Sequence, residues 1–130
     1  MSSRAAENRL AYFTLVYLAC YAPIETWASW PHLTSPFYLI DAIGMAQLLW
    51  GSVHSLAARP RRAPGLLAAG WAWTAANYWR AFFDRVRYVN EGGNLQLGAP
   101  EYWTVGGALV MALLCLALSA SMTARRTDQS

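Results

Sequence analysis

Residues 65–89 read GLLAAGWAWTAANYWRAFFDRVRYV, an apolar stretch that carries one stripe of polar and aromatic side chains. The members of the stripe follow one another at spacings of four, three, four and three residues: Trp73, Asn77, Arg80, Asp84 and Arg87. Such spacing places them on one face of a helix. The residues before Arg80 are apolar enough to enter a bilayer, where a charged side chain costs several kcal/mol unless it is paired or reaches water. The stripe therefore predicts a functional polar face on a membrane helix.

The composition of the whole chain is that of a membrane protein. Its 130 residues are 56% hydrophobic and 13% charged, whereas an average soluble domain is about 25% charged. The chain also contains seven Trp and seven Tyr, and large amphipathic rings favour the headgroup zone of a bilayer. We therefore expect one membrane domain with short loops and no soluble lobe.

Four apolar stretches predict an all-α fold, a polytopic bundle of four transmembrane helices that forms a single domain over residues 1–130. The predicted spans are residues 10–30, 36–57, 64–86 and 102–122. Each is close to the ~20 residues that a helix needs to cross ~30 Å of hydrocarbon. The first span follows two arginines, as the apolar part of a signal peptide would, but we expect it to be retained.

The placement of arginine predicts the orientation of the bundle. Both terminal segments and residues 59–62 are basic, whereas residues 29–35 contain no arginine. Cytoplasmic segments carry such an excess, so we expect a multi-pass protein of the cell (inner) membrane with both termini in the cytoplasm. Membrane lipids, and no nucleic acid, are then the partners of this basic charge. Arg85 and Arg87 argue against this orientation, because they cluster at the opposite end. We keep it because three separate segments agree, and the conflict indicates that these two arginines serve a site.

Three charged residues on different predicted helices lie at a similar depth. Glu25, Asp41 and Arg80 are each about five or six residues from the outer end of a span, which is roughly 7–9 Å along a helix. Because an unpaired charge is costly in hydrocarbon, we expect Arg80 to reach Glu25 or Asp41 directly or through one water. These three are the predicted reactive groups. Five further residues are predicted to contact a ligand: Tyr21, Trp27, Trp73, Asn77 and Asp84.

Two interpretations of this cluster stay open. It is either a structural ion pair that ties the helices together, or an outer-leaflet polar cavity for a hydrophobic, amphipathic small molecule or a lipid. If the cavity is catalytic, Glu25 and Asp41 would be the acid–base pair for isomerisation or cyclisation of a hydrophobic substrate.

Two other function classes are weighed against the cavity. A non-catalytic subunit or assembly factor would pack on a membrane partner through Gly106 and Gly107 and through the face of Ala68, Ala72 and Ala76. A small transporter would act as a homo-oligomer. A closed ion pair favours the subunit, a dead-end pocket favours binding or catalysis, and a path to His54 favours transport. Hydrolase, P-loop and dinucleotide motifs are absent. Cys20 and Cys115 form no CxxC, and no spacing supports a metal site, so no cofactor is expected.

Overall fold

The computed structural model describes residues 3–57, 63–93 and 100–127, and all the regular structure in these ranges is helical. Its four helices are α1 (Ser3–Ala28), α2 (Pro36–Leu56), α3 (Ala63–Asn90) and α4 (Pro100–Thr127). The all-α prediction is confirmed for these ranges. Helices α1, α3 and α4 extend beyond the predicted apolar spans. Arginine and several other polar residues have good helix propensity, so the helices continue outside the apolar runs. The basic segment 59–62 lies outside the described residues.

The turn between α1 and α2 shows how the sequence fixes a helix start. Ser35 caps α2, since its side chain accepts a hydrogen bond from the backbone N–H of Tyr38 at 3.3 Å, and Pro36 occupies the first helical position. Both residue types are favoured at these places. The hydroxyls of Thr26 and Tyr38 lie 3.0 Å apart and join the end of α1 to the start of α2.

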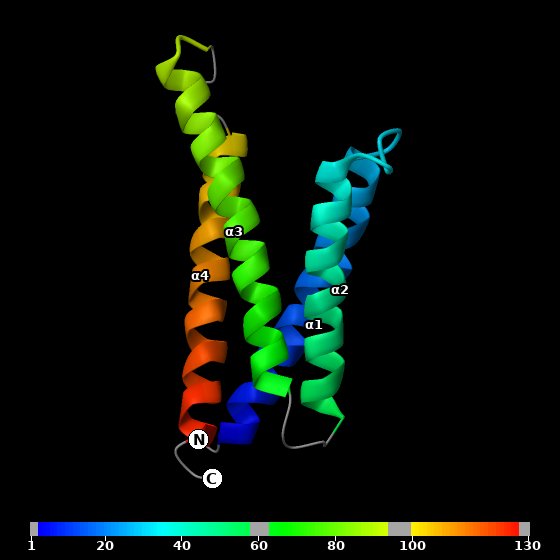
Figure 1. The fold of residues 1–130 in the computed structure, drawn as a ribbon, viewed down its shortest axis with the longest axis vertical. Coiled ribbons are helices and arrows are strands. Elements are labelled where there is room, and N and C mark those ends of the chain that lie inside the picture. Colours follow the sequence, from blue (N-terminus) through cyan, green and yellow to red (C-terminus); the bar gives the residue numbers. More distant parts are fainter. Residues whose placement is uncertain (1–2, 58–62, 94–99, 128–130) are drawn as a thin grey trace.

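The four helices form a bundle that is closed at one end and split at the other (Figure 1). α3 and α4 lie side by side, α2 packs on α3, and α1 packs mainly on α2. α1 begins and α4 ends at the same end of the molecule, which we call the closed half. Towards the opposite end, α1 and α2 diverge from α3 and α4, and we call this end the open half.

The hydrophobic core occupies the closed half. Its buried members are Leu10, Leu18, Leu48, Leu67, Trp71, Ala75, Ala112 and Cys115. Trp71 is fully buried, and its indole N–H donates to the Thr14 hydroxyl at 3.2 Å, which joins α3 to α1. Four buried hydroxyls each donate to the carbonyl four residues earlier in their own helix: those of Thr14, Ser52, Thr74 and Ser119. Such bonds satisfy a hydroxyl without a partner from another helix.

Two glycines allow α2 and α3 to meet in the closed half. A Cβ atom at Gly51 would lie 2.8 Å from the backbone nitrogen of Leu67, and one at Gly70 would lie 2.9 Å from Leu48. Small residues of this kind let helix backbones approach closely. The predicted pair Gly106 and Gly107 does not lie at such a close approach of two backbones. A Cβ atom at Gly106 would lie 3.2 Å from the ring of Phe82, and one at Gly107 would meet nothing within 4 Å.

One helix of the described ranges is long and apolar enough to cross a membrane, the segment Tyr102–Arg125 of α4 with a mean hydropathy of 2.1. Polar residues such as Glu25, Asp41 and Arg80 lower the hydropathy of the other three helices. The same residues lie in the open half, where they line the candidate site.

Candidate functional site

A cavity of about 660 Å³ lies in the open half, and all four helices contribute to its lining. Small-molecule sites usually have volumes of about 300–1,000 Å³. The lining combines carboxylates, guanidinium groups and phenols with apolar side chains such as Ile24, Ile40 and Val105. A space of this size and composition can hold a molecule that has both a polar and an apolar part.

Three tyrosines form the part of the cavity that borders the core. The hydroxyls of Tyr17 and Tyr78 lie 2.6 Å apart and form a hydrogen bond between α1 and α3. The ring of Tyr21 stacks on Tyr17 at a centroid distance of 5.2 Å and meets Tyr78 edge-on at 6.1 Å. This cluster presents phenol hydroxyls and aromatic rings beside the charged groups of the cavity.

Two carboxylates face the cavity from α1 and α2. Glu25 accepts a hydrogen bond from the hydroxyl of Ser29 at 3.2 Å, and Asp41 accepts one from the side-chain amide of Asn77 at 3.4 Å. The second bond crosses from α3 to α2. Within the described ranges, neither carboxylate forms an ion pair with an arginine or histidine.

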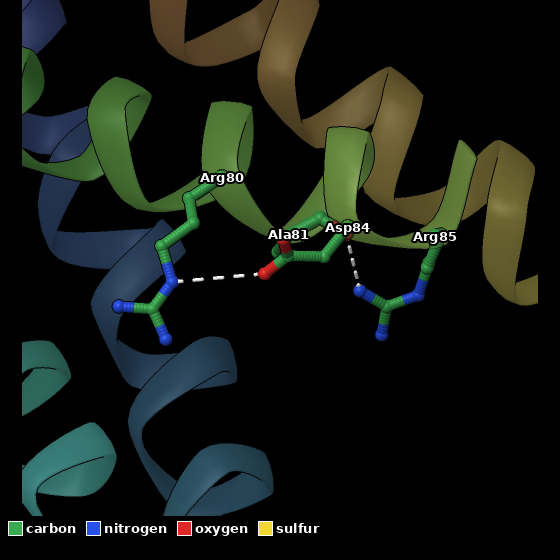
Figure 2. A network of polar contacts seen from close by, with 4 residues as sticks. All are labelled: Arg80, Ala81, Asp84 and Arg85. Carbon is green, nitrogen blue, oxygen red and sulfur yellow. Dashed lines mark hydrogen bonds and ion pairs between the residues drawn. The ribbon is translucent and has the colours of Figure 1, made fainter. Parts of the chain in front are cut away.

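Two arginines face the same cavity from α3. The Nε atom of Arg80 lies 3.8 Å from a carboxylate oxygen of Asp84, and its guanidinium lies over the ring of Phe37 at 4.9 Å. Arg85 donates to the carbonyl of Ala81 at 2.8 Å. Figure 2 shows both arginine side chains leaving α3 on the same side. The Arg80 side chain is 52% exposed, so its guanidinium can bind further groups.

The expected direct ion pair from Arg80 to Glu25 or Asp41 is not formed in the described structure. Arg80 pairs instead with Asp84, its neighbour one turn along α3. An acid four residues along the same helix is a close neighbour. The acids of α1 and α2 lie across the cavity from α3, in the half where the helices diverge. No direct ion pair of Arg80 therefore ties α3 to α1 or α2.

The cavity brings together six of the eight residues that the sequence singled out: Tyr21, Glu25, Asp41, Asn77, Arg80 and Asp84. Trp27 and Trp73 are not part of the lining. Trp27 is 81% exposed, because it follows Glu25 by two residues and so faces roughly the opposite side of α1. Trp73 shares the face of Asn77, but lies one turn nearer the core. There its indole N–H donates to the carbonyl of Ile40 at 2.9 Å, and its ring fills the space beside Gly44.

Sequence reasoning missed Tyr78 and Phe37 as parts of the lining. Tyr78 is next to Asn77 and so lies about 100° from the polar stripe around α3. It lines the cavity nevertheless, because the cavity extends to α1, where the hydroxyl of Tyr17 bonds to that of Tyr78. Only the crossing of the helices brings these side chains together. Tyr17 shares the face of Tyr21 by its spacing of four residues along α1, and it lines the cavity as well.

The described residues offer no group of three His, Cys, Asp or Glu side chains that could hold a metal ion. Comparison of the chain with protein-family models, with curated proteins and with solved structures gives no match. Function is therefore inferred from the geometry of the cavity. The assignment of Glu25 and Asp41 as an acid–base pair stays a prediction.

Proposed function

We propose that this chain is a multi-pass membrane protein that binds an amphipathic small molecule or a lipid in a cavity of the outer leaflet. The observation that carries the proposal is the cavity itself, which places charged groups and apolar side chains around one space between diverging helices. A lipid-facing protein that splits at one end offers such a space to molecules that already reside in the membrane.

The distribution of side chains over the bundle supports a membrane environment for all four helices. Six of the seven tryptophans are among the exposed large hydrophobic residues, and Trp71 is the buried one. Large apolar side chains are also exposed along each helix, for example Val16, Leu49, Phe83 and Leu114. Apolar surface of this extent is unusual on a soluble monomer. In a bilayer it would face lipid, while the backbone polar groups are satisfied within the helices.

The arrangement of the chain ends supports the predicted orientation. α1 begins and α4 ends at the closed half (Figure 1), and the exposed residues Arg4, Arg9 and Arg125 lie in these segments. With this basic end in the cytoplasm, the open half and its cavity would lie in the outer leaflet.

The inner boundary of the cavity favours binding over transport. In the described part of the chain, the lining extends to Leu48 and Thr74 and ends at the buried core around Trp71. His54 stacks on Trp50 at 5.1 Å and is not part of the lining. A space that ends at the core in this way supports the holding of a ligand rather than its passage to the cytoplasmic side.

The proposal is tested by filling the cavity. Ala81 lines it, so Ala81→Trp would occupy the space, whereas Ala72→Trp adds the same side chain at an exposed position of the same helix. Native mass spectrometry of the purified protein would measure the binding of dodecylphosphocholine. We expect one saturable molecule on the wild type and on Ala72→Trp, and loss of that molecule on Ala81→Trp. Equal binding to the two variants would contradict the proposal.

A further inference from the structure

We infer that the cavity selects a zwitterionic amphiphile, whose cationic group lies at Glu25 and Asp41 and whose anionic group lies at Arg80. The inference rests on the proposed function and adds the class of ligand. It starts from the charges in the cavity, where Glu25 and Asp41 face arginines of α3 without forming an ion pair with them, while Asp84 of α3 pairs with Arg80.

The acidic side of the cavity is open to a cation. Glu25 accepts a hydrogen bond from the Ser29 hydroxyl and Asp41 accepts one from the Asn77 amide, and no arginine pairs directly with either acid in the described ranges. An ionised carboxylate attracts a cationic group through its charge, so the two acids can bind an ammonium group without receiving a hydrogen bond from it. An ammonium group beside these acids would supply a positive charge, which Arg80 does not supply by direct pairing.

The tyrosine rings next to these acids fit an alkylated ammonium group. Tyr21 lines the cavity on the same helix as Glu25, with Tyr17 stacked on it and Tyr78 against its edge. Quaternary ammonium groups bind the faces of aromatic rings, which attract cations through their quadrupole. The face of Tyr21 that Tyr17 does not cover would contact the alkylated ammonium group, beside the two carboxylates.

The basic side of the cavity fits an anionic group. Arg80 touches Asp84 through its Nε atom at 3.8 Å, and its guanidinium has further N–H donors that can bind phosphate in a forked geometry. The cation–π contact with Phe37 holds this guanidinium beside the start of α2. Arg85 adds a second positive charge to the lining.

A ligand with a single charge would satisfy only one side of the cavity. A simple cation leaves the arginines without an added partner, and a simple anion leaves Glu25 and Asp41 in the same state. Because charges away from water are costly when unpaired, a ligand that carries both signs compensates more of the lining. The apolar residues Ile24, Ile40 and Val105 then contact its alkyl part.

The test compares three probes with the same alkyl chain: dodecylphosphocholine, dodecyltrimethylammonium and dodecyl phosphate. Native mass spectrometry in dodecyl maltoside would give the affinity of each probe for the wild-type protein. We expect dodecylphosphocholine to bind at least about tenfold more tightly than either of the other two probes, since each of these lacks one of the two charged ends that the lining would bind.

Charge-removing variants assign each end of the probe. We expect Glu25→Gln and Asp41→Asn to weaken dodecylphosphocholine and dodecyltrimethylammonium while dodecyl phosphate keeps its affinity. Arg80→Gln should weaken dodecylphosphocholine and dodecyl phosphate and spare the cation. Arg87→Gln is the matched control, because Arg87 pairs with Glu91 at 2.8 Å outside the cavity. It should leave the binding of all three probes unchanged.

Tightest binding of dodecyltrimethylammonium or of dodecyl phosphate, or equal binding of all three probes, would overturn the inference. If the three probes bind equally but Ala81→Trp still abolishes their binding, the cavity binds amphiphiles and only the charge selection fails. If Ala81→Trp also binds as the wild type does, the proposed function fails as well. A folded variant is recognised by an unchanged far-UV circular dichroism spectrum.

Discussion

The closed and open halves of the bundle are made from the same four helices, yet they differ in what lies between the helices. In the closed half, Gly51 and Gly70 bring the backbones of α2 and α3 together, and hydroxyl groups are buried against their own helices. In the open half, charged and aromatic side chains replace them, and the helices diverge around a cavity. The comparison indicates that the size of the residues between the helices sets the distance between them. The larger distance in the open half leaves room for the cavity.

The boundary between the halves is a pair of bonds from α1 to α3. Trp71 donates to Thr14 in the core. About one turn further along α1 and two turns further along α3, Tyr17 and Tyr78 share a hydrogen bond that faces the cavity. The first bond is buried and the second is open to a ligand. Variants in the closed half should therefore change stability, and variants in the open half should change binding.

The largest loss of stability is expected from Trp71→Ala. Trp71 is fully buried in the core, and truncating a buried tryptophan costs about 3–5 kcal/mol of unfolding free energy. Trp27→Ala, at an exposed position beyond the cavity, is the control and should cost much less. Unfolding in mixed micelles with rising sodium dodecyl sulfate would give both values. Equal losses would remove the distinction between the core and the surface.

The approach of α2 to α3 is tested by Gly51→Ala. The new Cβ would lie 2.8 Å from the backbone of Leu67, which cannot move without shifting α3. Overpacking of this kind costs about 1–3 kcal/mol. Gly107→Ala meets nothing within 4 Å, so it should be neutral or gain up to ~1 kcal/mol from helix propensity. The same unfolding titration distinguishes these signs, and a stabilising Gly51→Ala would show that α2 and α3 are not in close contact there.

A smaller contrast is expected between two threonines of α1. Thr14→Val removes the acceptor of the buried Trp71 indole, and an unsatisfied buried donor costs about 1–3 kcal/mol. Thr26→Val removes the half-buried contact with Tyr38, where water can replace the lost bond, so we expect a cost below about 1 kcal/mol. A larger loss at Thr26 than at Thr14 would place the structural centre of the bundle in the open half.

The smallest change of stability is expected from Arg80→Gln. A buried pair of Arg80 with Glu25 or Asp41 would make its loss cost about 3–5 kcal/mol. The observed contact with Asp84 is exposed and long, and pairs of this kind contribute about 0–1 kcal/mol. The unfolding free energy of Arg80→Gln should therefore lie close to that of Arg87→Gln. A loss of several kcal/mol at Arg80 alone would support the direct pairing.

The sequence predicted the helices and most of the charged residues of the cavity lining, because both depend on spacing along one helix. Glu25, Asp41 and Arg80 could be assigned to one level by counting residues, and all three line the cavity. Whether Arg80 forms a direct ion pair with Glu25 or Asp41 could not be predicted, because this depends on the distance between the helices. That distance follows from contacts such as Gly51 with Leu67, which no pattern within one helix reveals. Tyr78 was missed for the same reason, since only the position of α1 makes it part of the lining.

The central claim is that the open half contains an accessible cavity while the closed half is packed, and cysteine accessibility tests it most directly. Cys20 and Cys115 would be replaced by serine and alanine, and single cysteines would be placed by Ala81→Cys in the cavity lining and Ala75→Cys in the core of the same helix. A water-soluble cationic methanethiosulfonate would then be applied to native membranes. We expect Ala81→Cys to react, with protection by dodecylphosphocholine, while Ala75→Cys stays unmodified. Equal modification of the two positions, or none at Ala81→Cys, would contradict the account.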